Sequence, residues 1–128
     1  MSSQTDAPAE PKQYSGACHC GKFKYTFPHA PFENGEADVF SCNCSLCTAK
    51  GLLLLRIPAK DFTFTAGTLD ELTRYEWNTG KYLHHFCPVC GTEAVLTYDE
   101  MVTVNVRTVP GLDLEKLKLK KFDGANLL

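Results

Sequence analysis

The sequence predicts a small, mainly β domain with little helix, and three observations support this prediction. From Gln13 onward, short segments rich in β-branched and aromatic residues alternate with Gly, Pro, Asn and Asp, which is the pattern of many short strands. The length of 128 residues is typical of one domain. The seven cysteines form three clusters whose spacing is typical of metal ligands rather than of disulfides.

The N-terminal residues 1–12 mix Ser, Pro, Ala and charged residues without periodicity. We therefore expect a disordered tail there and a single domain over residues 13–128. The predicted strands follow in chain order: Tyr14–Cys18, Lys22–Phe27, Ala37–Cys42, Leu52–Ile57, Phe62–Thr65, Glu71–Trp77, Tyr82–Phe86, Glu93–Tyr98 and Val102–Arg107.

Two of these strands have distinct hydrophobic patterns. The uninterrupted run Leu52–Leu55 suits a strand buried on both faces, whereas the alternation in Met101–Val106 is typical of a half-buried strand. Helix is expected only as a turn after Cys44 and over Asp113–Lys118. The alternating aromatic residues of the early strands are expected in the core, not as a platform for stacking bases.

Composition and charge exclude several classes of function. The net charge of −2 and the pI near 6.0 give no global attraction to nucleic acid or anionic lipid. The longest apolar run, Gly51–Leu55, is far shorter than the roughly 20 residues that cross a bilayer. The N-terminus has no signal-peptide pattern, so we expect a cytoplasmic protein that binds neither nucleic acid nor membrane, with reduced cysteines.

Two of the cysteine clusters are predicted to share one ion. Residues two apart in an extended chain point to the same side, so Cys18 and Cys20 can form one half of a site. A CxxC turn brings Cys87 and Cys90 together as the other half, which completes a tetrahedral Cys₄ zinc site. Gly21 and Gly91 follow the two pairs directly and allow left-handed turns that bring backbone amides toward the sulfurs.

The third cluster, Cys42, Cys44 and Cys47, offers three thiolates. Three protein ligands and a free position distinguish catalytic zinc from structural zinc. Two alternatives stay open from the residues alone. A nearby His or Asp would make this site structural as well, or the three thiols would be free and buried.

Three segments together resemble a known family: GACHCGKFKYTF (16–27), CNCSLCTAKG (42–51) and HHFCPVCGTEAV (84–95). In order and spacing they are similar to the glutathione-dependent formaldehyde-activating enzymes, a family that includes centromere protein V. The resemblance implies a Mss4-like zinc-binding sheet fold (β-tent) of short antiparallel strands. It also implies two zinc ions per chain, the structural one on Cys18, Cys20, Cys87 and Cys90 and the catalytic one on Cys42, Cys44 and Cys47.

The activity that the resemblance implies is that of a carbon–sulfur lyase, which interconverts S-hydroxymethylglutathione with glutathione and formaldehyde. Glutathione would then be a co-substrate, and a homodimer is an open alternative to a monomer. Asn43 stands where bacterial members often have His, and Thr48 and Ala49 replace a frequent arginine pair, so contacts to an anionic substrate are expected to differ. The short tail argues against the chromosomal role of centromere protein V.

Proton transfer in such a reaction needs a further group near the metal. The candidates are His19, His84, His85 and Glu93, all close in sequence to the cysteines. We favour His85 over His84 because strand alternation places it on the face of Cys87, although a surface or supporting role is common for histidine. The predicted catalytic set is therefore Cys42, Cys44, Cys47, His85 and Glu93.

Two other functions remain open at this point. The first is a zinc enzyme that catalyses hydrolysis, hydration or dehydration of another small molecule, and the second is a non-catalytic zinc scaffold that binds a protein partner. The loop Asn78–Lys81 reads as a plain turn more than as a substrate contact. The lysines at 116, 118, 120 and 121 read as a solvated surface more than as a site for carboxylates.

Overall fold

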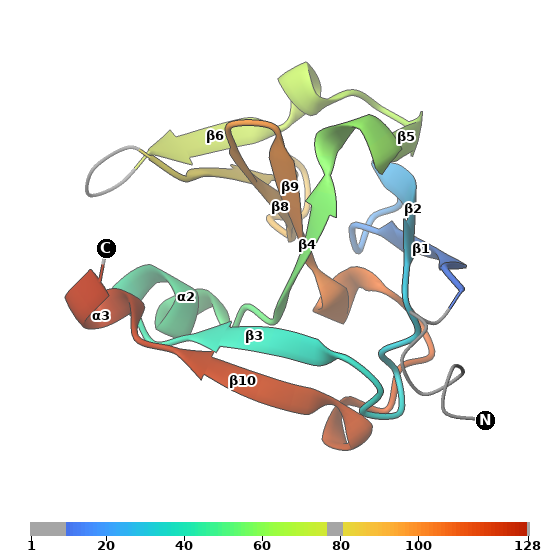
Figure 1. Cartoon of the computed structure of the whole chain (residues 1–128). Helices are drawn as coiled ribbons and strands as arrows, with labels where there is room; N and C mark the ends of the chain where they lie inside the picture. Colours follow the sequence, from blue (N-terminus) through green and yellow to red (C-terminus); the bar gives the residue numbers. More distant parts are fainter. Residues whose placement is uncertain (1–9, 77–80, 128) are drawn as a thin grey trace.

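The computed structural model describes residues 10–76 and 81–127 of the chain, and these form a mainly β structure (Figure 1). The strands are β1 (Lys12–Ala17), β2 (Lys24–His29), β3 (Asp38–Cys42), β4 (Leu54–Pro58), β5 (Thr63–Ala66), β6 (Thr73–Glu76), β7 (Leu83–Phe86), β8 (Glu93–Tyr98), β9 (Met101–Asn105) and β10 (Lys118–Phe122). The helices are α2 (Ser45–Lys50) and α3 (Gly124–Leu127), with 3₁₀ turns η1 (Ala59–Asp61), η2 (Leu69–Glu71), η3 (Val106–Thr108) and η4 (Leu114–Lys116).

The strands form two sheets. One has the order β1-β2-β5, and the other has the order β10-β3-β4-β9-β8-β7-β6. Every pairing is antiparallel except that of β10 with β3, so the prediction of short antiparallel strands with little helix is confirmed. Figure 1 shows β3 and β10 side by side, with β4 leading from them toward the group formed by β6, β8 and β9.

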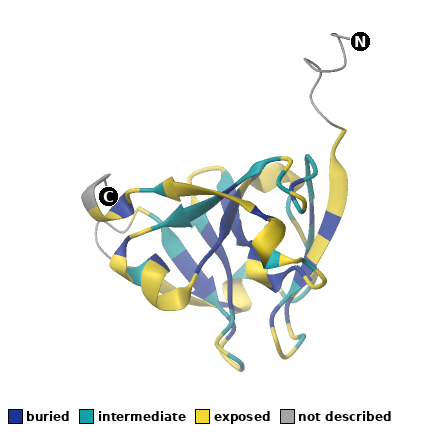
Figure 2. Cartoon of the chain, turned by 90° about the horizontal axis from the view of Figure 1, so that it is seen from below, coloured by how far each residue is buried: buried dark blue, intermediate teal, exposed yellow. Residues whose placement is uncertain are grey.

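The main core lies between the two sheets. Phe23, Tyr25 and Phe27, in and before β2, have no exposed surface and pack in one cluster with Ile57 and Val104 of the larger sheet. The expectation that these aromatic residues belong to the core is therefore confirmed. Figure 2 shows the buried residues concentrated along the strands in the middle of the molecule and the exposed ones on outer strands and turns.

The segment Leu52–Leu55 divides this core from a second cluster. All four leucines are buried, as predicted for a run that is covered on both faces. Leu53 and Leu55 pack in the main core, whereas Leu52 and Leu54 pack in a cluster with Cys44 and Cys47. The entry into β4 therefore connects the core of the domain to the three-cysteine group.

The prediction of a half-buried strand over Met101–Val106 is wrong. Thr103 and Asn105 are buried as well as the neighbouring valines, because β9 lies between β4 and β8. Leu96, directly opposite Thr103, packs against Cys44 and Cys47, so the second face of the sheet is covered too. The Asn105 side chain is satisfied by donating to the backbone carbonyl of Glu93 at 3.0 Å.

The end of the chain also differs from expectation. The predicted helix over Asp113–Lys118 is only the single turn η4, and the unpredicted strand β10 follows it and pairs with β3 in parallel. The sequence KLKKF has few β-branched or aromatic residues, and lysine is a common residue of edge strands. The predicted turn after Cys44 is confirmed as α2.

At the N-terminus, β1 begins at Lys12, one residue before the predicted domain boundary. The residues outside the described ranges include most of the predicted tail, the last residue of the predicted strand Glu71–Trp77, and residues 78–80 of the predicted Asn78–Lys81 turn. Among the residues that are described, no helix has the length and apolar character needed to cross a bilayer.

Candidate metal centres and catalytic site

The four cysteines predicted to share one ion come together at one end of the two sheets. Their sulfur atoms lie within 4.8 Å of one another. The Sγ atom of Cys20 is 3.6 Å from those of both Cys18 and Cys87. A zinc ion with Zn–S bonds of about 2.3 Å in a tetrahedron separates its sulfur ligands by about 3.8 Å. The four side chains therefore fit a structural zinc ion.

Backbone geometry around these sulfurs also suits thiolates. Gly21 and Gly91 have φ angles of 81° and 80°, the left-handed conformation that glycine adopts without strain. Next to these glycines, the Phe23 amide donates to Cys18 Sγ at 3.4 Å and the Cys90 amide donates to Cys87 Sγ at 3.5 Å. Amides that point at sulfur stabilise the charged ligand.

Thr92 supports this site and was not singled out by the sequence. Its hydroxyl accepts from the His19 amide at 3.2 Å and lies 3.2 Å from Cys90 Sγ. The hydrogen bond from Thr92 lowers the pKa of the Cys90 thiol to about 5. His19 itself is exposed, and its backbone makes the contact.

The other three cysteines form a separate group at the start of α2. Cys42 is the last residue of β3, Cys44 is the N-cap of α2, and Cys47 lies in the first turn. The Cys47 amide donates to Cys44 Sγ at 3.3 Å, and the Cys44 amide donates to Cys42 Sγ at 3.5 Å. Within the described parts of the chain, this group contains three metal-ligating side chains and no fourth, which fits zinc with an open position.

Asn43, between two of these cysteines, holds the end of the chain. Its Nδ2 donates to Asp123 Oδ1 at 3.0 Å, and its Oδ1 accepts from the Ala125 amide at 2.9 Å. The Asn43 amide also donates to the Phe122 carbonyl at 3.1 Å. Asn43, which differs from the histidine of many bacterial members, therefore contacts residues about eighty positions later in the chain. The spacing of the cysteines did not predict these contacts.

Glu93 is buried at the side of α2 and takes part in two polar contacts. Its Oε1 accepts from Lys50 Nζ at 2.5 Å, and its Oε2 lies 2.7 Å from His84 Nδ1. The side chains of Glu93 and His84 are only 4% and 5% exposed, so the ion pair with Lys50 compensates for the burial of the carboxylate. Sequence reasoning named Glu93 and His84 as candidates but missed Lys50.

His85, the neighbour of His84 in β7, makes no hydrogen bond to Glu93 and lies on the side of the main core. It is directly opposite Val95 of the main core, and its Nε2 lies 2.8 Å from Thr97 Oγ1. Burial lowers the pKa of His85. The structure thus joins Glu93 to His84 and not to His85, and a catalytic role for His85 stays a prediction.

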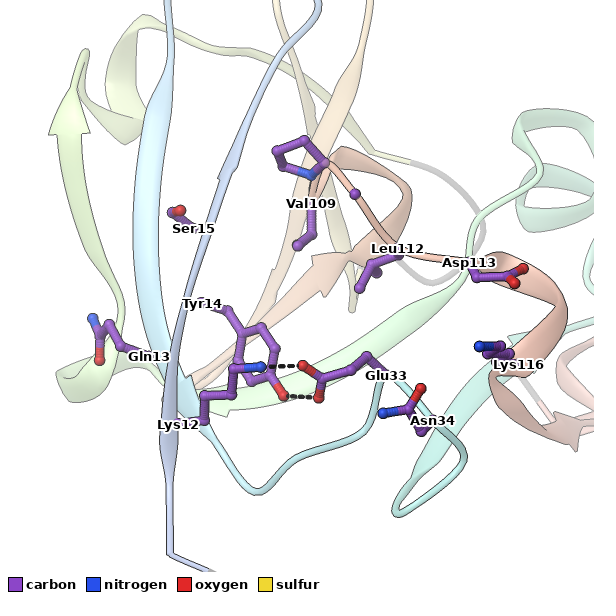
Figure 3. A pocket seen from close by; sticks show the side chains of 12 residues that line it. Lys12, Gln13, Tyr14, Ser15, Glu33, Asn34, Val109, Leu112, Asp113 and Lys116 are labelled. Atoms are coloured by element: carbon purple, nitrogen blue, oxygen red, sulfur yellow. Dashed lines mark hydrogen bonds and ion pairs between the residues drawn. The ribbon is translucent and has the colours of Figure 1, made fainter.

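A cavity of about 410 Å³ opens elsewhere, between β1 and the loop that follows η3. Its lining includes Tyr14, Glu33, Val109 and Leu112, and none of the predicted site residues. Figure 3 shows Lys12 and Tyr14 converging on the Glu33 carboxylate at this cavity. Two of its charged side chains, Lys12 and Glu33, pair with each other.

Comparison with known proteins agrees with this architecture. The family model for glutathione-dependent formaldehyde-activating enzymes matches residues 13–120. A crystal structure of a Rhodobacter sphaeroides protein is similar in fold, with a TM-score of 0.67 and 28% sequence identity, over 83% of this chain and 99% of the other.

Proposed function

Because this chain belongs to the glutathione-dependent formaldehyde-activating enzyme family, we propose that it is a zinc-dependent carbon–sulfur lyase that interconverts S-hydroxymethylglutathione with glutathione and formaldehyde. The observation that supports this most is the three-cysteine group at the start of α2, which has no fourth protein ligand among the described residues. Glutathione acts as co-substrate, and the four-cysteine group holds a second, structural zinc ion.

The residues of the three-cysteine group define where the reaction takes place. Zinc held by Cys42, Cys44 and Cys47 supplies a Lewis acid that favours the thiolate form of a sulfur near it. Cys44 and Cys47 are buried, whereas Cys42 is partly exposed, so solvent reaches the group at Cys42. In the direction of breakdown, the adduct loses its hydroxyl proton, a C=O bond forms, the C–S bond breaks, and the sulfur takes up a proton.

A side chain of the protein must take the proton from the hydroxyl group of the adduct and supply one to the sulfur. Glu93 and His85 are the predicted candidates, and Glu93 is supported by its position beside α2, where it contacts Lys50. The usual contacts to glutathione carboxylates are expected to differ in this chain. Thr48 and Ala49 of α2 are exposed and uncharged, and Lys50 is already paired with Glu93.

The test is exchange between formaldehyde and glutathione, followed by NMR on purified protein loaded with zinc. We expect exchange faster than the spontaneous reaction, and we expect Cys44→Ser to abolish the acceleration while circular dichroism shows an unchanged fold. Ser45→Ala, at the adjacent exposed position, is the matched control and should retain full activity.

Two results would refute the proposal in different ways. Zinc-loaded protein without any acceleration would favour a zinc enzyme that catalyses hydrolysis or a hydration step on another small molecule. A fourth protein ligand on the zinc of the three-cysteine group would favour a non-catalytic scaffold for a protein partner. X-ray absorption would detect it as a nitrogen or oxygen neighbour of zinc that stays bound in the absence of substrate and does not exchange with water.

A further inference from the structure

His84 lies on the face of the sheet that packs against the three-cysteine group, as its register and its neighbours indicate. It lies directly opposite Leu96 across β7 and β8, and residues in such a pair project from the same face of the sheet. Leu96 packs in one cluster with Cys44 and Cys47. Tyr82, two positions before His84, packs against the same cluster.

The polar contacts of His84 determine which ring nitrogen carries the proton. Nδ1 lies 2.7 Å from Glu93 Oε2, and a carboxylate only accepts hydrogen bonds. Nδ1 therefore carries a proton, and in the neutral form of the ring Nε2 is the nitrogen that keeps its lone pair. Lys50, which follows Cys47 by one helical turn, holds the other oxygen of Glu93 and so limits rotation of the carboxylate.

From this geometry we infer that His84 Nε2 carries the proton in the lyase reaction, while Glu93 and Lys50 act through it as positioning residues. This inference rests on the proposed function and revises the assignment of proton transfer. Nε2 takes the proton from the hydroxyl oxygen of the adduct, the O–H electron pair forms the C=O bond, and the C–S bond breaks. His84 then returns the same proton to the departing sulfur, so no other reactant is needed.

The first test measures the position of the proton without using activity. Long-range ¹H–¹⁵N NMR of the zinc-loaded protein should show His84 protonated on Nδ1 and unprotonated on Nε2. In Glu93→Gln, Lys50 still occupies the side-chain oxygen, so the amide NH₂ faces His84 and the proton should move to Nε2. Thr97→Val is the matched control, because it removes the contact of His85 and should leave the His84 spectrum unchanged.

The second test is kinetic. His84→Gln should reduce kcat for the exchange by about 10²-fold or more, with KM and a zinc content of two ions unchanged. Glu93→Gln should also reduce kcat, whereas Thr97→Val should keep it. Should Glu93→Gln fail to fold, the wild-type spectrum and His84→Gln still decide the question.

The outcomes separate the inference from the proposed function. Active wild-type protein with His84 protonated on Nε2, or His84→Gln active to within about threefold, overturns the inference and leaves the lyase proposal standing. Wild-type protein that gives no acceleration refutes the lyase proposal and the role of His84 with it.

Discussion

Glu33 shows how one side chain connects segments that are distant in sequence. Its Oε1 accepts from the Tyr14 hydroxyl at 2.5 Å and from the Phe32 amide at 3.3 Å, and its Oε2 pairs with Lys12. The hydrogen bonds from Lys12 and Tyr14 lower the pKa of Glu33 to about 2. The carboxylate thereby fastens the first strand to the turn after β2.

This contact makes part of the stability dependent on pH. The pKa of Glu33 is lower in the folded chain than the value of about 4.3 in an unfolded one. The unfolded chain therefore binds more protons in this window, and stability falls as the pH drops from about 4.3 toward about 2. We expect Glu33→Gln to reduce the free energy of unfolding by about 1 kcal/mol at pH 7.

Urea unfolding of both proteins between pH 7 and pH 3 measures this effect. The difference in the free energy of unfolding between the two proteins should shrink toward pH 3. This difference reports on Glu33 alone, because the protonation of the zinc-binding thiolates in acid affects both proteins equally. Glu115→Gln, at an exposed position, should change nothing. A difference that stays constant over the whole range would contradict the prediction.

At the scale of elements, the C-terminal strand is attached to the three-cysteine turn. β10 pairs in parallel with β3 along its whole length, from Lys118 opposite Asp38 to Phe122 opposite Cys42. The side chain of Asn43 then continues the contact to Asp123 and Ala125. The backbone between two predicted zinc ligands is thus fixed by the last residues of the domain.

We expect Asn43→Ala to release this end of the chain. The loss of two partly exposed hydrogen bonds should cost about 1 kcal/mol, while the thiolates and zinc content are retained. Hydrogen exchange of the Ala125 amide, which donates to Asn43, should speed up about fivefold, the factor that corresponds to about 1 kcal/mol. Asn34→Ala is the control, and unchanged exchange at Ala125 in the Asn43 variant would show that the contact does not hold the segment.

These elements also show where sequence patterns succeed. Continuous burial of Leu52–Leu55 followed from an apolar run, and α2 followed from the residues after Cys44. The sequence did not predict the strand β10, because its pairing with β3 joins segments some eighty residues apart. Its lysines also resemble those of any solvated segment. The sequence of β9 did not predict its burial on both faces, because the residues that cover the second face belong to other elements.

For the whole molecule, the four-cysteine site joins the two sheets. Cys18 and Cys20 lie between β1 and β2, whereas Cys87 and Cys90 lie between β7 and β8. The contact between Cys20 and Cys87 connects positions 67 residues apart. An ion at this site therefore restricts a long loop in the unfolded chain, and its binding energy contributes to folding.

We expect Cys20→Ser to lower the melting temperature by more than roughly 10 °C, although Cys20 is exposed and the substitution leaves no cavity. Cys44→Ser, at the other site, should have a smaller effect. His19→Ala keeps the backbone contact to Thr92 and should melt like the wild type. Equal melting of Cys20→Ser and wild type, with zinc content measured alongside, would argue against a structural ion.

By itself, the sequence determined the short strands, the core aromatic residues and the division of seven cysteines into groups of four and three. These depend on local patterns, since spacing along a strand or through a turn brings Cys18 to Cys20, Cys87 to Cys90, and Cys42 to Cys44 and Cys47. Only the tertiary structure decided that Glu93 contacts His84 and Lys50, and that Asn43 holds the C-terminal segment. Such contacts depend on strand register, and the register shift between His85 and Phe86 interrupts the alternation from which His85 was chosen.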